Sequence, residues 1–258
     1  PLASSGTNNI TTGMNRFEVG GHIIQTSSTT RVFKGIIAEV IYYNRGISTG
    51  ELNRTQSYLS IKYGIPLNPS AVSNYLASDG SVIWSGVSNA AYSNTIIGIG
   101  RDDNSGLSQY QSSSSLGNDI LTLGVGSITT SNVLNASTNP GVFAVDRSFL
   151  LVGNNAISSG VTNTTDLPTN PSTPLPMRMR MGRVWIAQVT GTIGAQSLQF
   201  NLAGALSSST GVSYQTADLC LLIDRGNTGS FTNSISGTGS TGGVFTGATQ
   251  VGASSSTV

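Results

Sequence analysis

The sequence predicts an all-β protein with antiparallel sheets and one convincing helix. Short apolar segments rich in β-branched and aromatic residues recur along most of the chain, and Gly, Asn or Ser bound them. Only 9% of the 258 residues are charged, against about 25% in a typical soluble domain. Ser, Thr, Asn and Gly fill the difference. We expect strands over 1–47, a helix and linker over 48–74, a β-sandwich over 75–251 and a tail over 252–258.

The first predicted strands lie within residues 17–43. Ile36–Tyr43 is nearly all apolar and β-branched or aromatic, which is typical of a strand buried on both faces. Glu39 is the exception in this segment. It is interpreted either as a carboxylate on the solvent side or strand end, or as a ligand or a buried partner of Arg45 or Lys34.

The predicted helix spans residues 48–64. Ser48 and Glu51 have the spacing of a capping box, in which each side chain accepts the other residue's backbone N–H. Gly64 fits the left-handed position after a helix, and Pro66 prevents continuation. The stretch from Pro66 to Asn74 is predicted to be a linker.

The remainder of the chain is predicted to be β-structure. Thr162–Pro176 holds four of the eight prolines and is predicted to be a surface loop. In Met177–Met181 the methionines alternate with arginines, so the arginines are expected on a solvated sheet face. The predicted strands are Ser81–Trp84, Thr95–Gly100, Ile120–Gly124, Phe149–Val152, Met177–Met181, Arg183–Val189, Ser197–Leu202, Asp218–Ile223 and Gly243–Thr246.

Several functional classes are disfavoured by composition. Twelve Lys and Arg balance eleven Asp and Glu, so no basic patch for nucleic acid is expected. No run of about 18 apolar residues predicts a membrane span. The single histidine, His22, begins a predicted strand after Gly20 and Gly21, and the single cysteine, Cys220, lies in an apolar run. Neither forms a recognisable nucleophile motif, so we do not expect an enzyme.

One turn is a candidate cation site. Asp102 and Asp103 open an oxygen-rich turn that ends at Gly106, and carboxylates are preferred calcium ligands. The alternative is a hairpin turn with ordinary Asn and Gly chemistry. No other cofactor is expected.

Three stretches taken together carry a resemblance. The stretches are Phe33–Arg45 with the helix Ser48–Gly64; Tyr75–Gly80 with Ile97–Asp103; and Arg183–Gln188 with Leu221–Asp224. The first stretch resembles the final strand and trailing helix of a laminin-G or concanavalin-like jelly roll. The three stretches together resemble an uncharacterised β-domain that follows such jelly rolls in large secreted surface proteins of Bacteroidetes.

The resemblance implies a partial jelly roll followed by an antiparallel β-sandwich. It also implies an extracellular or cell-surface location in a multidomain, adhesin-like protein. The start at Pro1, without an initiator Met or a signal peptide, indicates a mature fragment or part of a longer protein. The strands that would complete the jelly roll are then expected earlier in that protein, or from another chain.

The leading functional hypothesis is therefore a structural or adhesive segment without chemistry of its own. Its expected partners are neighbouring domains or copies of the same protein. The alternative is a carbohydrate-binding module that presents aromatic platforms to surface glycans. The candidate platform residues are Tyr42, Tyr43, Trp84, Tyr92, Tyr110, Trp185 and Tyr214.

Overall fold

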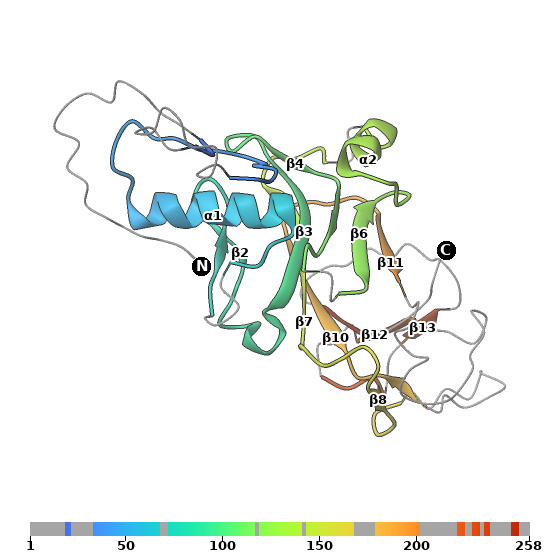
Figure 1. Cartoon of the computed structure of the whole chain (residues 1–258). Helices are drawn as coiled ribbons and strands as arrows, with labels where there is room; N and C mark the ends of the chain where they lie inside the picture. The colour runs from blue at the N-terminus through green and yellow to red at the C-terminus, as the bar shows by residue number, and fades with distance from the viewer. Residues whose placement is uncertain are drawn as a thin grey trace. The chain divides into compact units, whose positions relative to one another are not determined.

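The computed structural model describes residues 19–21, 33–67, 72–116, 119–140, 143–167, 179–201, 221–224, 229–232, 235–237 and 249–252. The chain divides into two compact units, Pro1–Ser48 and Thr49–Val258, and each is considered by itself (Figure 1).

The second unit contains all the regular elements of the described residues. Its helices are α1 (Thr49–Tyr63), the 3-10 turn η1 (Ala90–Tyr92) and α2 (Asn132–Thr138). Its strands are β1 (Tyr75–Leu76), β2 (Val82–Trp84), β3 (Asn94–Asp102), β4 (Leu107–Gln109), β5 (Gln111–Ser113), β6 (Leu121–Val125), β7 (Ser148–Asn154), β8 (Thr162–Asn163), β9 (Arg180–Met181), β10 (Val184–Thr190), β11 (Gln196–Phe200), β12 (Leu221–Asp224), β13 (Ile235–Gly237) and β14 (Thr249–Gly252).

The predicted all-β fold is confirmed. A seven-stranded sheet has the order β13-β12-β14-β10-β7-β3-β4, and a three-stranded sheet has the order β11-β6-β5. Two further strand pairs, β1-β2 and β8-β9, complete the described sheets. Every strand pair is antiparallel, as the sequence predicts.

The main core lies between the two larger sheets. Alternate residues of β3, β7 and β10, such as Ile99, Leu150 and Trp185, form one buried cluster with Leu123 of β6 and Phe200 of β11. Because side chains alternate across a strand, one residue in two points toward the three-stranded sheet. This packing of apolar faces gives the unit its sandwich character.

The opposite face of the seven-stranded sheet is covered as well. Phe149, Leu151 and Ile186 belong to a second buried cluster with Ile61 of α1 and Trp84 of β2. Strands β3, β7 and β10 therefore bury both faces, which explains why their sequences are nearly continuous apolar runs. Helix α1 is part of this unit, so the unit boundary lies before the helix and not after it.

Local sequence explains where α1 stops. The Ile65 N–H donates to the Ser60 carbonyl at 3.1 Å, the hydrogen bond that closes a Schellman motif. Gly64 lies at φ +61°, and a Cβ there would stand 2.1 Å from the Ser113 carbonyl oxygen. Both the backbone angle and the close approach therefore require glycine at this position.

The predicted strand at Ile36–Tyr43 is wrong. Residues 33–48 contain no helix or strand, and Ile36, Ile37, Val40 and Ile41 are 93%, 44%, 49% and 40% exposed. An apolar run becomes a buried strand only where sheet neighbours pair with it and cover its side chains. The described part of this unit, residues 19–21 and 33–48, contains no such sheet.

Two further local predictions need correction. The sequence did not predict α2, which begins after the N-cap Ser131, whose hydroxyl accepts the Leu134 N–H at 3.2 Å. Arg180 was expected on a solvated face, but it is 8% exposed and forms two hydrogen bonds to the Asp166 carboxylate. The predicted strand Gly243–Thr246 lies outside the described residues.

Candidate functional site

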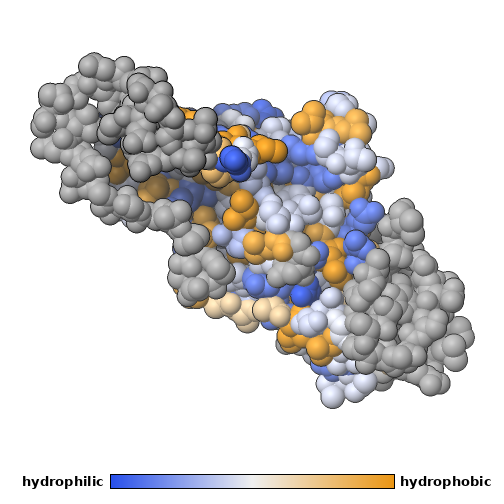
Figure 2. Space-filling model, viewed as in Figure 1, coloured by the Kyte–Doolittle hydropathy of each residue, from blue (hydrophilic) through white to orange (hydrophobic). Residues whose placement is uncertain are grey.

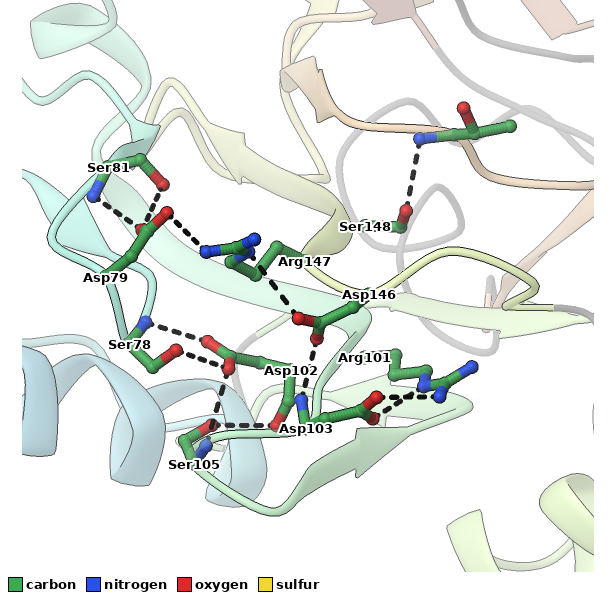
Figure 3. A network of polar contacts seen from close by, with 11 residues as sticks. Ser78, Asp79, Ser81, Arg101, Asp102, Asp103, Ser105, Asp146, Arg147 and Ser148 are labelled. Atoms are coloured by element: carbon green, nitrogen blue, oxygen red, sulfur yellow. Dashed lines mark hydrogen bonds and ion pairs between the residues drawn. The ribbon is translucent and has the colours of Figure 1, made fainter.

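Polar clusters lie at the two ends of the paired strands β3 and β7. Arg101 is opposite Ser148 at one end of this pair, and Asn94 is opposite Asn154 at the other. We name these groups the Asp102 cluster and the Asp119 cluster. The Asp102 cluster comprises Ser78, Asp79, Ser81, Arg101, Asp102, Asp103, Ser105, Asp146 and Arg147 (Figure 3). The Asp119 cluster comprises Asn94, Thr95, Asp119, Asn154 and Arg183.

Asp102 is a buried carboxylate that organises two turns. Its Oδ2 accepts the Ser78 N–H at 2.8 Å, and its Oδ1 accepts the Ser78 hydroxyl at 2.6 Å. Its Oδ1 also accepts the Ser105 N–H at 3.4 Å. Both oxygens therefore face donors of the protein itself, and the side chain links the turn before β2 to the turn after β3 (Figure 3).

Asp103 points away from Asp102 and toward Arg101 (Figure 3). The Arg101 guanidinium donates from Nε and Nη2 to the two Asp103 oxygens at 2.6 and 2.7 Å. This paired hydrogen bond lowers the pKa of the Asp103 carboxyl and raises the pKa of Arg101. Arg101 also donates from Nη1 to the Phe143 carbonyl at 2.9 Å, so it anchors a neighbouring loop.

A second ion pair completes the Asp102 cluster. Arg147 donates to Asp79 Oδ2 at 2.8 Å and lies 3.6 Å from Asp146 Oδ2. The Ser81 hydroxyl and N–H lower the pKa of the Asp79 carboxyl, and Arg147 adds to this shift. The side chains of these ion pairs are thus partly exposed to solvent.

The calcium prediction at Asp102 and Asp103 gains no support from this geometry. The two carboxylates diverge and each is engaged by its own donors. Calcium needs several oxygen ligands that converge on one point. Among the described residues, no three His, Cys, Asp or Glu side chains are placed to hold a metal ion.

The Asp119 cluster is buried, and the sequence analysis missed it. Asp119 Oδ2 accepts the Thr95 hydroxyl at 2.9 Å and the Asn154 side-chain N–H at 3.0 Å. Its Oδ1 accepts the Ile120 N–H at 2.8 Å and lies 3.4 Å from Arg183 Nη1. The Asp119 and Arg183 side chains are 1% and 8% exposed.

Asn154 is fully buried at the centre of this cluster. Its Oδ1 accepts two hydrogen bonds at 2.9 Å, from Asn94 Nδ2 and from the Ala156 N–H. Its Nδ2 donates to the Thr95 hydroxyl as well as to Asp119. Thr95 has φ +43°, a left-handed angle that β-branched residues rarely adopt. It lies where the register between β3 and β7 shifts.

No motif could have identified the Asp119 cluster in the sequence. Thr95 and Asn154 are 59 residues apart, and Asp119 lies 24 residues after Thr95. The pairing of β3 with β7 brings Thr95 and Asn154 together, and Asp119, two residues before β6, reaches both side chains.

The predicted aromatic platforms are mostly core residues. Trp84 and Trp185 are fully buried, and Tyr110 packs edge-on against Phe143 with ring centroids 5.1 Å apart. Tyr42 and Tyr43 are exposed, whereas Tyr214 lies outside the described residues. His22 and Cys220 also lie outside them.

Comparison with known proteins assigns the second unit to a family. A family model described as a domain of unknown function, DUF8202, matches residues 51–254. The chain belongs to this family. No curated protein and no solved structure matches the chain.

The DUF8202 match begins two residues into α1 and contains both polar clusters. This range supports the observation that the helix belongs with the sheets that follow it. None of the helices described in the DUF8202 domain is long and apolar enough to span a membrane.

Proposed function

We propose that the chain is a structural or adhesive segment of an extracellular multidomain surface protein or filament. In this role it performs no chemistry on a substrate, and its partners are neighbouring domains or copies of the same protein. The observation that carries this proposal is the exposed apolar segment Ile36–Tyr43.

Exposed apolar residues in a continuous run usually mark an interaction surface. Ile36, Ile37, Val40 and Ile41 present their side chains to solvent within six residues of each other. The segment is rich in residues that favour strands, which suits docking on the edge of a partner sheet.

The DUF8202 domain supports a structural role in a different way. In both polar clusters, carboxylates are bound to donors of the same domain. Its surface mixes hydrophobic and polar areas, and α2, with exposed Val133 and Leu134, is one of the hydrophobic areas (Figure 2). A surface with so few charges offers little like-charge repulsion against self-association.

The extracellular location rests on the resemblance to surface proteins and on the Ser, Thr, Asn and Gly-rich composition. The carbohydrate-binding alternative has less support, because the two tryptophans that would form stacking platforms are buried.

Sedimentation velocity over a range of concentrations tests the proposal. We expect the wild-type chain to self-associate, and we expect Ile36→Lys to reduce this association without lowering the unfolding midpoint. Val87→Lys is the matched control, because Val87 is an exposed apolar residue of the DUF8202 domain. A wild-type chain that stays monomeric at every concentration and binds no immobilised copy of itself would contradict the proposal.

A glycan array separates the two functions. Binding of a glycan that Tyr42→Ala abolishes would replace the structural proposal with the carbohydrate-binding one. No binding to any glycan, together with self-association, supports the structural role.

A further inference from the structure

The Asp119 cluster contains a hydroxyl nucleophile beside a carboxylate. The Thr95 hydroxyl donates to Asp119 Oδ2 at 2.9 Å and contacts the Asn154 amide nitrogen. A hydroxyl becomes a competent nucleophile when an adjacent base accepts its proton. Asp119 therefore stands in the position of a general base for Thr95.

The amide of Asn154 is arranged as an electrophile. Its carbonyl oxygen, Oδ1, accepts hydrogen bonds from Asn94 Nδ2 and from the Ala156 N–H, each at 2.9 Å. Two donors on one carbonyl oxygen are the arrangement that stabilises the oxyanion formed when a nucleophile attacks the carbon.

Asp119 can also return the proton to the leaving nitrogen, Asn154 Nδ2. Asn154 Nδ2 lies 3.0 Å from Asp119 Oδ2, the same oxygen that accepts the Thr95 hydroxyl proton. A single carboxylate oxygen thus contacts both the atom that must lose a proton and the atom that must gain one.

The reacting groups are shielded from water and belong to paired strands. Thr95 and Asn154 are 2% and 0% exposed, so competing hydrolysis is suppressed and electrostatic interactions are strong. The positive φ of Thr95 stores strain at this position, a feature that clusters at sites with a function. Holding both groups on paired strands replaces a bimolecular encounter with an intramolecular one.

We propose that the folded protein forms an ester bond between Thr95 Oγ1 and Asn154 Cγ, with release of ammonia. As Oγ1 moves onto Cγ, Asp119 accepts the hydroxyl proton and the C–O bond forms. Asn94 and Ala156 stabilise the negative charge on Oδ1. Asp119 then gives the proton to Nδ2, the C–N bond breaks and ammonia leaves. The carboxylate is regenerated, and the step needs no oxidant, reductant or cofactor.

The bond would link β3 to β7, which are neighbours in the seven-stranded sheet. It would close a covalent loop across a sequence separation of 59 residues and restrict the unfolded chain as a disulfide does. The inference goes beyond the structural role proposed above and does not depend on it, because the reaction is internal to the DUF8202 domain.

The intact mass of the wild-type chain, purified folded and then denatured, tests the inference. We expect a mass about 17 Da below the value calculated from the sequence, the loss of one ammonia. Proteolysis should yield a cross-linked pair of peptides that contain Thr95 and Asn154. Mild alkali should hydrolyse the ester and separate the pair.

Variants assign the mass loss to this bond. Thr95→Val should have its full calculated mass, whereas Thr95→Ser should retain the loss because it keeps a hydroxyl. Thr164→Val is the matched control at an exposed threonine and should also retain the loss. Circular dichroism confirms that each variant is folded.

Two results would overturn the inference. One is a folded wild-type chain that keeps its full calculated mass after prolonged incubation. The other is a loss of about 17 Da that persists in Thr95→Val, because it would indicate closure of Asn154 onto the following backbone nitrogen instead of an ester. The wild-type measurement is decisive even if a variant does not fold, and neither result bears on self-association.

Discussion

The ion pairs at the two ends of the β3–β7 pair lie in opposite environments. In the Asp102 cluster, the ion pairs involve side chains that are about a third to a half exposed, such as Arg147 and Asp79 at 47% and 41%. In the Asp119 cluster, Asp119 and Arg183 are almost completely buried. Solvent screens the first set of charges, whereas the second set depends on protein partners for its solvation.

The two clusters also connect different parts of the fold: the Asp102 cluster links turns, and the Asp119 cluster links strands. The Asp102 cluster connects the turn at Ser78, the turn at Ser105 and the loop at Phe143. The Asp119 cluster connects β3, β7 and the residue that precedes β10 within the sandwich. The same strand pair therefore has partly exposed ion pairs at one end and a buried ion pair at the other.

The largest expected effect is that of Asp119→Ala. The substitution leaves Arg183 buried without its carboxylate and removes the acceptor of Thr95 and Asn154. We expect a loss of about 3–5 kcal/mol in the free energy of unfolding, measured by denaturant titration. Asp103→Ala at the exposed end is the control and should cost far less, because its pair with Arg101 faces solvent. Equal losses would contradict the comparison.

Substitution of a glycine should also destabilise the protein more at the Asp119 end of the strand pair than at the Asp102 end, but by a smaller margin. A Cβ at Gly153 would stand 2.2 Å from the Tyr92 carbonyl oxygen and 3.0 Å from the Trp84 ring. We expect Gly153→Ala to cost about 1–3 kcal/mol by overpacking. Gly106, in the turn after β3, has open space but φ +69°, so Gly106→Ala should cost only about 1 kcal/mol. Thermal unfolding of both variants shows which substitution destabilises the protein more.

The smallest expected effect is the response of the exposed cluster to acid. The pKa values of Asp79 and Asp103 lie below their ordinary value of 3.8 in the folded state. Their contribution to stability is therefore fully present above pH 3.8 and is lost as the pH falls through the folded pKa values.

Denaturant titrations above and below pH 3.8 measure the stability lost on acidification in wild type and in Asp103→Asn. The variant should lose less stability on acidification, and the difference should shrink in about 1 M salt, where the Debye length is short. A larger decrease in the variant would show that the depressed pKa of Asp103 does not stabilise the fold.

The parts of the fold that the sequence predicts well are those with strong local patterns. Strands β3, β7 and β10 are almost continuous apolar runs, because they are buried on both faces. Helix α1 begins directly after Ser48, the predicted N-cap, and ends at Tyr63, before Gly64. Helix α2 was missed because it is short and rich in Asn, Ser and Thr, which favour caps and turns over helix interiors.

Other features depend on tertiary contacts that no local pattern contains. The run Ile36–Tyr43 is apolar except at Glu39 and has the local pattern of a buried strand, yet its apolar side chains are exposed, because burial depends on neighbours. Asp102 and Asp103 are adjacent in the sequence, but their side chains diverge toward Ser78 and Arg101. The Asp119 cluster exists only because the fold brings together residues that are distant in sequence.

A pair of double-mutant cycles tests the central contrast most directly. One cycle combines Asp119→Ala with Arg183→Ala, and the other combines Asp79→Ala with Arg147→Ala. We predict a coupling of about 1–3 kcal/mol for the buried pair and one indistinguishable from zero for the exposed pair, although its N–O distance of 2.8 Å is the shorter one. A coupling for Asp79 and Arg147 that equals or exceeds the coupling for Asp119 and Arg183 would contradict the account.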